Sequence, residues 1–342
     1  MAARRLSHAA TANIRKIVVT ARTFDSTLQL LTSPQTNVLH NPHAAPWSRD
    51  ELVHHAADAH ALVCFMTDSV DAQLLDACPQ LQMVACALKG FDNFDTEECA
   101  RRGVAVTAVP DLLTAPTAEL AIALGLGLGR HVRAGDDLVR RGDFHGWRPQ
   151  LYGTGIAGST IGIFGAGAVG LAVASCLRGF APAKILYHDT QPLPLETERH
   201  LGLTAATEGL EQLLAESDLV FICTPLSAQT RHAISRDTLG AARRGVLLVN
   251  ISRGSCVCEA AVADALESGA LGGYAADVFE FEDWAWAGRP AGIEPRLRKH
   301  PNTLFTPHLG SAVESARREI ERAAATEVVR WLDGTPLLHR VN

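Results

Sequence analysis

The chain has no C-x-x-C pair, and its eight cysteines are scattered along 342 residues. This spacing excludes the dense disulfide framework of a small secreted domain and offers no paired-thiol redox motif. Reduced thiols are therefore expected, in a cytoplasmic protein. The nearest two cysteines, Cys256 and Cys258, have no further ligands beside them and would make a poor metal site, so no metal is expected.

Long apolar runs are also missing. The longest, residues 120–129, is far shorter than the roughly 20 residues of a membrane span and instead predicts a buried helix. The first 23 residues hold five basic and no acidic residues, which superficially resembles a transit peptide. No apolar segment follows Arg4 and Arg5, so a secretory signal is not expected. Residues 1–13 are expected to form an untethered leader.

An excess of positive charge is lacking too. With 31 basic and 37 acidic residues, the formal net charge is -6. A protein that binds nucleic acid irrespective of sequence needs a surplus of Lys and Arg on one face, so nucleic acid is not an expected partner. A composition of 47% hydrophobic and 20% charged residues is typical of a globular protein, and the length predicts two domains. The expected partner is a small molecule.

Apolar strand-like runs alternate with longer helical patterns, which predicts α/β architecture with parallel sheets. In the first third, strands are expected at residues 17–20, 61–64, 81–84 and 104–106. A long helix is expected from Pro116 to Arg141, ended by Gly142. Six more strands are expected at residues 160–164, 184–187, 219–222, 245–249, 273–276 and 303–305. Six such strands match a complete dinucleotide-binding sheet.

A G-x-G-x-x-G motif directly follows the strand expected at residues 160–164. In this motif Gly165 permits a tight turn, Gly167 lets the backbone approach a pyrophosphate, and Gly170 allows close helix packing. Asp189 follows 19 residues after Gly170, close to the spacing of a carboxylate that binds ribose hydroxyls. The carboxylate would repel the 2'-phosphate of NADP, and the next residue, Thr190, is not an arginine that could compensate. NAD is therefore favoured over NADP. A solvent-exposed acid at a strand end remains the alternative for Asp189.

Polar segments follow several later strands, where an α/β sheet forms its ligand crevice. Arg253 can bind an anionic oxygen with its planar fork. Glu282 and His308 can pair, because a carboxylate orients an imidazole and holds its proton affinity near the working pH. A structural hydrogen-bonding role for His308 also remains open. Lys89, in the first third of the chain, adds a second fixed cation and indicates a small, doubly charged substrate.

These motifs carry a family resemblance. Residues 165–170, 250–254, 277–282 and 307–311 resemble the NAD-dependent D-2-hydroxyacid dehydrogenases, over about residues 14–341. Four further segments are similar to the phosphite dehydrogenases of that family: residues 87–95, 109–114, 146–150 and 303–313. The family usually has a carboxylate or amide where this chain has Cys258. A cysteine caps poorly, so the helix start there is expected to be weaker by about 1 kcal/mol.

The resemblance implies two Rossmann-like doubly wound domains. Residues 1–114 and 309–342 would form a discontinuous substrate domain, and residues 115–308 an inserted NAD domain. It also implies a homodimer, with the segment around Trp147 to Tyr152 near the active site or the subunit contact. The implied reaction belongs to phosphorus metabolism: phosphite, NAD and water give phosphate and NADH.

Carried over residue by residue, the resemblance also assigns the site. The implied catalytic residues are Arg253, Glu282, His308 and the additional anion-binding Lys89. The implied substrate pocket contains Met66, Leu88, Lys89, Gly90, Trp147, Tyr152, Arg253, His308, Ser311 and Arg317. The implied cofactor contacts are Thr117, Gly165, Gly167, Ala168, Val169, Gly170, Asp189, Thr224, Pro225, Ile251, Ser252, Arg253, Asp277, His308, Gly310 and Ser311.

Two alternatives remain open for the function. The first is a D-2-hydroxyacid dehydrogenase acting on a compound such as glycerate or glyoxylate. The family's usual hydroxyacid enzymes have a Gly-rich loop without lysine where this chain has Leu88 and Lys89. The prediction of phosphite as the substrate therefore depends on Lys89. The second alternative is an NAD-responsive scaffold that resembles transcriptional corepressors, which would show no turnover.

Overall fold

The computed structural model describes residues 14–342, which form two compact units. One contains the described residues up to Pro110 together with Arg318–Asn342, and the other contains Asp111–Arg317. The second unit thus interrupts the first in sequence. The boundaries expected from sequence lie four and nine residues from these, and the assignment of the substrate to the first unit stays a prediction. The expected leader, residues 1–13, lies outside the described residues.

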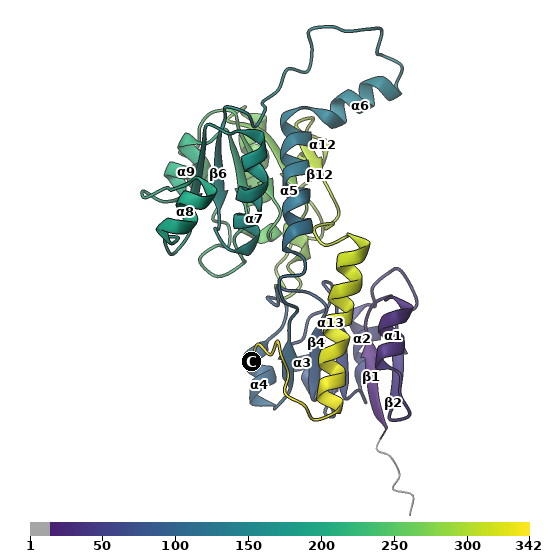
Figure 1. Ribbon diagram of the computed structural model, residues 1–342. Helices are drawn as coiled ribbons and strands as arrows, with labels where there is room; N and C mark the ends of the chain where they lie inside the picture. Colours follow the sequence, from purple (N-terminus) through teal and green to yellow (C-terminus); the bar gives the residue numbers. More distant parts are fainter. Residues whose placement is uncertain (1–13) are drawn as a thin grey trace, which may run out of the picture. The chain divides into compact units, whose positions relative to one another are not determined.

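The first unit contains a parallel sheet of five strands in the order β2-β1-β3-β4-β5 (Figure 1). Its strands are β1 (Arg15–Val19), β2 (Thr36–His40), β3 (Ala61–Cys64), β4 (Met83–Cys86) and β5 (Ala105–Thr107). Its helices are α1 (Asp25–Leu31), α2 (Arg49–Ala56), α3 (Ala72–Ala77), α4 (Thr96–Arg101) and most of α13 (Glu314–Leu332). The strand order reverses between β1 and β3, as in a doubly wound fold.

The second unit contains a parallel sheet of seven strands in the order β12-β11-β10-β9-β6-β7-β8. The strands are β6 (Thr160–Phe164), β7 (Lys184–His188), β8 (Leu203–Ala205), β9 (Leu219–Ile222), β10 (Val246–Asn250), β11 (Leu271–Ala276) and β12 (Thr303–Phe305). The helices are α5 (Thr114–Gly129), α6 (Val132–Arg140), α7 (Ala168–Leu177), α8 (Leu195–Leu201), α9 (Leu210–Glu216), α10 (Arg236–Gly240), α11 (Glu259–Glu267) and α12 (Pro295–Lys299). Three short 3-10 turns are η1 (Arg178–Phe180), η2 (Gly254–Cys256) and η3 (Glu280–Glu282).

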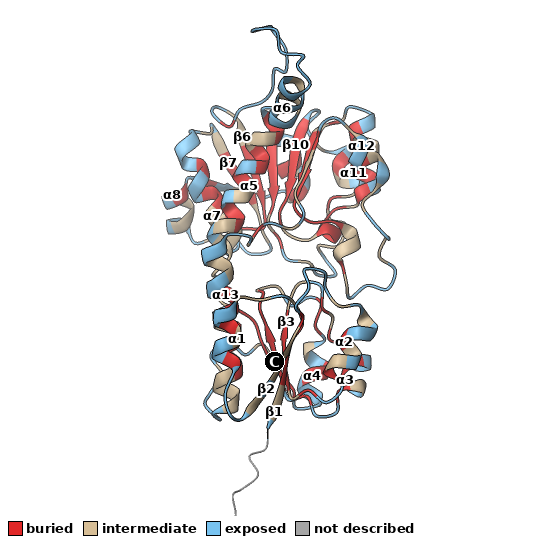
Figure 2. Cartoon of the chain, turned by 90° about the vertical axis from the view of Figure 1, so that its right-hand side faces the viewer, coloured by how far each residue is buried: buried red, intermediate tan, exposed pale blue. Residues whose placement is uncertain are grey.

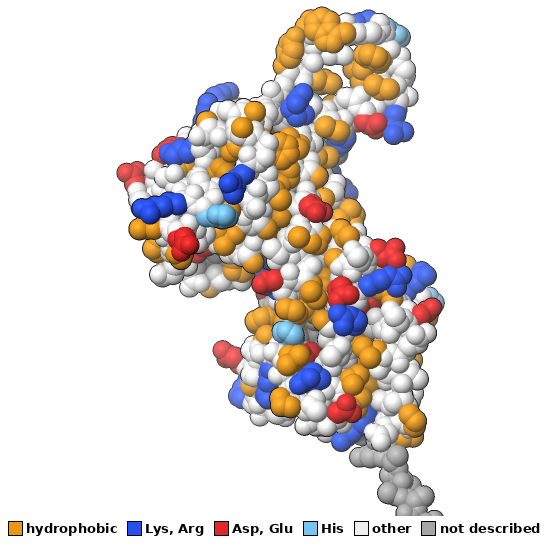
Figure 3. Space-filling view, viewed as in Figure 1, with side chains coloured by type: hydrophobic (Ala, Val, Ile, Leu, Met, Phe, Trp, Pro, Cys, Tyr) orange, Lys and Arg blue, Asp and Glu red, His pale blue; other side chains and the backbone are white. Residues whose placement is uncertain are grey.

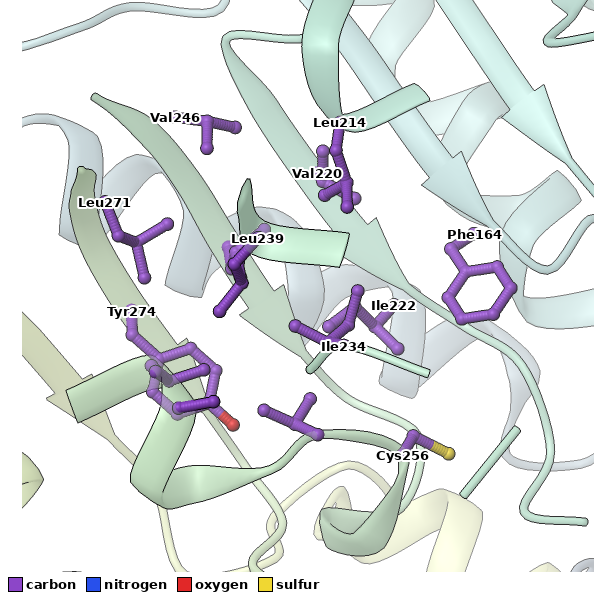
Figure 4. Close-up of a cluster of buried hydrophobic side chains, with 14 of the residues drawn as sticks. Phe164, Leu214, Val220, Ile222, Ile234, Leu239, Val246, Cys256, Leu271 and Tyr274 are labelled. Carbon is purple, nitrogen blue, oxygen red and sulfur yellow. The ribbon is translucent and has the colours of Figure 1, made fainter. Parts of the chain in front are cut away.

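The central strands are buried on both faces, which explains their nearly continuous apolar sequences. Successive residues of β9 point to opposite faces of the sheet, so Val220 lies in one hydrophobic cluster and Phe221 in the other. Figure 2 shows the buried strands within each unit and the exposed outer faces of the helices. Figure 4 shows one cluster, in which Leu239 of α10 lies beside side chains of the central strands such as Val246. Within residues 14–342, no helix has both the length and the apolar character that crossing a bilayer requires.

The predicted α/β class with two Rossmann-like domains is confirmed, and all ten expected strands are present, four with the expected bounds and six with shifted ends. Two strands were missed: β2 and β8. Both lie at the edge of a sheet, and neither is fully buried. An edge strand lacks the continuous apolar pattern on which the prediction depended.

The single helix expected from Pro116 to Arg141 is wrong. The chain forms α5 and α6, separated by His131 in a left-handed conformation with φ 52°. At the break, the carbonyl of Gly129 accepts a hydrogen bond from the backbone N–H of Thr154 at 2.8 Å. This contact with a segment 25 residues later takes the carbonyl out of the helical ladder. The expected end at Gly142, which has φ 79°, is confirmed.

A buried carboxylate, Asp68, joins two strand ends in the first unit. It accepts hydrogen bonds from the hydroxyl of Thr20, after β1, and from the backbone N–H of Phe65, after β3, the latter at 2.7 Å. Burial raises the pKa of Asp68 to about 6. Since the pKa is higher in the folded than in the unfolded state, this group favours folding most when protonated, below about pH 4. That contribution, about 3 kcal/mol, is lost as the pH rises through 6.

We therefore expect Asp68→Asn to remove a pH-dependent part of the stability. Between pH 4 and pH 7 the wild type should lose about 3 kcal/mol of unfolding free energy that the variant retains. Denaturant unfolding of both proteins at the two pH values measures this difference. Equal losses in both proteins would show that Asp68 has the same pKa in the folded and unfolded states.

Candidate active site

The G-x-G-x-x-G motif forms the turn between β6 and α7, as predicted. Gly165 has φ 97°, and a Cβ there would lie 2.6 Å from the backbone nitrogen of Thr224. A Cβ on Gly170 would lie 2.0 Å from the carbonyl oxygen of Gly165. Both positions therefore require glycine, one for backbone conformation and both for close packing.

The start of α7 fits a dinucleotide pyrophosphate. Gly167 is the N-cap, and the position of its Cβ would face open space. With no side chain to cap the helix, the first-turn N–H groups of Ala168 and Val169 can bind an anion, and the helix dipole favours negative charge there. Ala168 is exposed and Val169 half-buried, so both are placed to contact a cofactor.

Asp189 lies directly after β7, beside the glycine turn. Its Oδ2 accepts a hydrogen bond from the backbone N–H of Ala166 at 2.7 Å, and its Oδ1 accepts one from that of Thr190 at 2.7 Å. The two bonds hold the carboxylate at the end of β7, next to the turn that would bind the pyrophosphate. This arrangement fits the predicted role of Asp189 as the acceptor for ribose hydroxyls.

We expect Asp189→Ala to increase the use of NADP. The carboxylate would repel a 2'-phosphate, and facing like charges cost several kcal/mol, so kcat/KM for NADP should rise by about tenfold or more. Initial rates with NAD and NADP, under identical salt, measure the ratio. Asp237→Ala, in α10 away from the glycine turn, is the control and should leave the ratio unchanged. An unaltered ratio in Asp189→Ala would contradict the assigned role.

The predicted pair of His308 and Glu282 is formed. Nδ1 of His308 lies 2.7 Å from Oε2 of Glu282, and the other oxygen of Glu282 accepts the backbone N–H of Phe279 at 2.9 Å. Because an ionised carboxylate only accepts hydrogen bonds, Nδ1 carries the hydrogen. The proton exchanged with a substrate therefore belongs to Nε2.

Asp277 shapes the loop that carries His308. Its buried carboxylate accepts the Thr306 hydroxyl at 2.6 Å, the Leu309 N–H at 2.6 Å and the Gly310 N–H at 2.9 Å. These bonds stabilise His308 in a left-handed conformation with φ 57°, which is costly for a residue other than glycine. Burial raises the pKa of Asp277. Asp277 thus has a positioning role in addition to the cofactor contact that the sequence predicted.

Arg253 lies on the loop after β10, next to the loop that carries Glu282. A Cβ on the following Gly254 would overlap the backbone of Phe279, at 1.8 Å from its carbonyl carbon, so the two loops touch. The side chain of Asn250, buried at the end of β10, accepts the Ser252 N–H at 3.1 Å and donates to the Arg253 carbonyl at 3.0 Å. The sequence prediction included residues 250–254 as a motif but gave Asn250 no role in the site, although a polar residue ending an apolar strand was its signal.

The remaining predicted cofactor contacts lie at the same edge of the second unit. Thr117, in the first turn of α5, donates a hydrogen bond to the Gly310 carbonyl at 3.3 Å. Thr224 and Pro225 follow β9, and Ile251 and Ser252 follow β10. Ser311 follows Gly310 and is half-buried. Apart from Thr117, the structure thus gathers these predicted cofactor residues on the loops that follow strands of the second sheet.

The first unit gathers a separate group of predicted residues. Met66 follows β3, and Leu88, Lys89 and Gly90 follow β4, so all four lie at the carboxyl edge of this sheet. Asn93 connects the two loops by donating a hydrogen bond to the Met66 carbonyl at 3.3 Å. Leu88 is buried, whereas Lys89 and Gly90 are half-buried.

Within the chain, the structure does not bring Trp147 and Tyr152 to His308, so their place in the substrate pocket stays a prediction. They are 83% and 76% exposed, on a segment whose end at Thr154 contacts Gly129 at the end of α5. Thr117, which contacts the His308 loop, is twelve residues earlier in α5, about 18 Å away along the helix. Figure 1 shows this segment leaving the unit beyond α6. Arg317, half-buried, lies in the first turn of α13.

The two cysteines near Arg253 are free thiols, of which Cys256 is buried and Cys258 is half-buried. Within the described part of the chain, no group of three or more His, Cys, Asp or Glu side chains is placed to hold a metal ion. Cys258 is the N-cap of α11 and makes no side-chain capping bond, as expected. A carboxylate oxygen of Glu280 lies 3.4 Å from the backbone nitrogen of Glu259 and supplies a weak acceptor instead.

The chain is similar to known dehydrogenases. The family model "D-isomer specific 2-hydroxyacid dehydrogenase, NAD binding domain" matches residues 122–310. A glyoxylate reductase of Pyrococcus horikoshii is 35% identical over 291 residues, covering 84% of each chain, and one of Thermofilum pendens is 34% identical over 321 residues, covering 93% and 92%. These relatives are named for glyoxylate reduction and not for the phosphite-oxidising branch suggested by the sequence.

Solved structures agree with the family match. A protein of Thermus thermophilus matches with a TM-score of 0.85 at 31% identity, over 96% of this chain and 100% of that one. The NADPH-dependent glyoxylate/hydroxypyruvate reductase of Sinorhizobium meliloti, solved with NADP and malonate, matches with a TM-score of 0.80 at 28% identity, over 96% of both chains. The chain is thus an NAD-dependent oxidoreductase that belongs to the D-isomer-specific 2-hydroxyacid dehydrogenase family.

Proposed function

We propose that the chain oxidises phosphite to phosphate with NAD. The observation that carries this proposal is Lys89, held between Leu88 and Gly90 at the carboxyl edge of the first sheet. Phosphite is largely a dianion near neutral pH, and two cations, Lys89 and Arg253, suit two negative charges. A 2-hydroxyacid has one carboxylate charge, for which an arginine and backbone N–H groups suffice. The added lysine is therefore the feature that favours the inorganic substrate.

The His308 and Glu282 pair would supply the base. Phosphite oxidation needs a water oxygen to attack phosphorus while hydride leaves phosphorus for the nicotinamide of NAD. Nε2 of His308 would accept a proton from that water, while Glu282 supports the resulting positive charge through the 2.7 Å contact with Nδ1. A positioned base of this kind typically contributes about a hundredfold to ten-thousandfold.

The second candidate is the reduction of glyoxylate or a related 2-oxoacid. Relatives at 34–36% identity are named glyoxylate reductases, which favours this reaction over phosphite oxidation. The same residues would act in this reaction: Arg253 would bind the carboxylate, and Nε2 of His308 would donate a proton to the keto oxygen. Lys89 is the residue that this candidate leaves without an assigned purpose.

One assay separates the candidates. The purified protein is mixed with NAD and phosphite, glycerate, lactate or glycolate, and NADH formation is followed by absorbance. The reverse reaction uses NADH and glyoxylate. We expect kcat/KM for phosphite to exceed that for every hydroxyacid by about a hundredfold or more, as a site built around the extra charge would require. Efficient glyoxylate reduction without phosphite oxidation would establish the second candidate, and no turnover of any compound would favour an NAD-responsive scaffold.

We also propose a homodimer that uses α6 and the segment after it. No residue of α6 is buried, and the exposed apolar side chains here include Val132, Val139, Phe144, Trp147 and Tyr152. Figure 3 shows hydrophobic side chains gathered on the segment that projects beyond α6. An exposed apolar patch of this kind is typical of a protein interface. A second copy is the occupant that the family resemblance implies.

We expect the double change Trp147→Ser and Tyr152→Ser to weaken the dimer. Aromatic side chains often dominate interface energy, so the dissociation constant should rise by about tenfold or more. Sedimentation equilibrium measures it. Leu195→Ser, which changes another exposed apolar residue, on α8, is the control and should leave the mass unchanged. A wild-type protein that sediments as a monomer would refute the homodimer.

A further inference from the structure

A buried carboxylate lies one residue beyond Glu282 and contacts two other loops of the second unit. Oδ2 of Asp283 accepts a hydrogen bond from Nη2 of Arg231 at 2.6 Å and another from the hydroxyl of Ser255 at 2.9 Å. The side chain of Asp283 is 5% exposed. A charge this deeply buried is retained only when its partners are well placed.

The three residues come from loops after three neighbouring strands. Arg231 belongs to the loop after β9, Ser255 to η2 after β10, and Asp283 follows η3 after β11. These same loops carry residues of the site: Thr224 and Pro225, then Arg253, then Glu282. Asp283 therefore connects the predicted cofactor, anion and acid-base segments through a single oxygen.

The contact between Arg231 and Asp283 also leaves one buried polar group without a partner in the described part of the chain, which lowers stability. Nη1 of Arg231 is buried and has no hydrogen-bond acceptor among residues 14–342. The guanidinium is centred 4.9 Å from the ring of Trp286, which offers a cation-π contact but no acceptor for that nitrogen. Buried donors without acceptors are rare in native proteins and call for an explanation. A role in the geometry of the site provides one.

The segment between Phe279 and Asp283 is a short turn, and its Glu280 also contacts Glu259 and His232. Glu282 and Asp283 donate backbone hydrogen bonds to Phe279 and Glu280 at 3.0 and 3.2 Å, the pattern of one 3-10 turn. Single 3-10 turns have poor hydrogen-bond geometry, so side-chain contacts at their ends help to fix their orientation. Asp283 supplies that contact directly next to Glu282.

We propose that Asp283, held by Arg231 and Ser255, is a positioning residue that keeps Glu282 in contact with Nδ1 of His308. This inference rests on the proposed acid-base role of the His308 and Glu282 pair. Displacing a catalytic group by about 1 Å can lower a rate by about a hundredfold. Loss of the contact at Asp283 should therefore reduce kcat without changing which cofactor or substrate is bound.

The central experiment compares Asp283→Asn and Arg231→Met with the wild type. We expect kcat to fall about tenfold to a hundredfold, and the KM for NAD to change by less than about twofold. Arg231→Lys keeps one donor and the charge, so it should recover part of the loss. Ser255→Ala removes a single hydrogen bond and should lower kcat by less than about tenfold.

Asp264→Asn is the matched control. Asp264 accepts Arg296 at 2.6 Å and also pairs with Arg236, so it too joins separate segments of the second unit, but from α11. We expect this variant to lower the unfolding temperature and to leave kcat within about twofold. If Asp283→Asn retains wild-type kcat, or if its loss equals that of Asp264→Asn at equal folded fraction, the proposal is overturned.

The double variant Arg231→Met with Asp283→Asn tests whether the two residues act together. We expect the kcat of the double variant to equal that of the less active single variant, because either change breaks the same contact. Losses that multiply would show two independent effects and would contradict the proposal.

A measurement without turnover separates this inference from the proposed function. Histidine labelled with ¹⁵N reports the ring N–H that His308 directs at Glu282, and its absence in Glu282→Gln assigns it. We expect the signal to be lost or shifted in Asp283→Asn and retained in Asp264→Asn. An unchanged signal in Asp283→Asn overturns the positioning role. A wild type that turns over neither phosphite nor glyoxylate overturns the proposed function while this test still applies.

Discussion

Replacing His308 with glutamine lowers kcat by about a hundredfold to ten-thousandfold, whichever substrate the enzyme oxidises. Glutamine can still donate a hydrogen bond to Glu282 through its side-chain amide, but it cannot accept and release a proton near neutral pH. The contact of 2.7 Å between Nδ1 and Glu282 directs that chemistry to Nε2 in the wild type. Steady-state rates over a range of pH, with saturating NAD, measure the loss.

Two controls make this result specific to proton transfer. NAD affinity, followed by tryptophan fluorescence, should stay within about threefold, since the glycine turn and Asp189 are untouched. Glu282→Gln should lose less activity than His308→Gln, because it weakens support of the imidazole without removing it. A His308→Gln variant that keeps a tenth or more of the wild-type kcat would exclude His308 as the base and leave it a structural residue.

Replacing Lys89 with methionine lowers kcat/KM for phosphite by about a hundredfold to a thousandfold, the range observed when one preorganised donor to a developing anion is removed. Methionine has similar length and keeps the apolar contacts of the lysine stem, so only the charge and its hydrogen bonds are lost. Glyoxylate reduction, if present, should change by less than about tenfold, because its single carboxylate depends on Arg253. Initial rates with both substrates measure the two ratios.

Lys89→Arg is the matched control for charge. It should keep more phosphite activity than methionine but less than the wild type, since a planar fork does not replace a compact ammonium. Equal phosphite activity in the wild type and Lys89→Met would remove the reason for choosing phosphite. The relatives' names would then decide in favour of a 2-oxoacid.

Local sequence predicted the buried central strands and missed two edge strands, β2 and β8. β6, β9 and β10 are apolar except for Thr160 at the start of β6 and Asn250 at the end of β10, because both faces of a parallel sheet are covered, so their pattern is strong. β2 is a partly exposed edge strand, and its sequence carries no comparable signal. The break between α5 and α6 depends on a contact of Gly129 with Thr154, which no local pattern encodes.

The candidate site shows the same division. Gly165, Asp189, Arg253, Glu282 and His308 could be predicted, because each follows a strand and parallel strands bring their carboxyl ends to one edge. The roles of Asn250, Thr306 and Asp283 could not. Each acts through a contact with a residue on another loop, and such contacts depend on the packing of neighbouring strands.

The sequence by itself determined the α/β class, the glycine turn, the carboxylate that favours NAD, and the types of side chain that can perform hydride-transfer chemistry. These follow from local pattern and from the chemistry of single residues. Only the tertiary structure decided that Glu282 contacts Nδ1 of His308, that Asp277 stabilises a left-handed histidine, and that the segment of Trp147 and Tyr152 contacts Gly129 at the end of α5. The reason is physical: hydrogen bonds between loops form only after the sheet has set the distances between their strands.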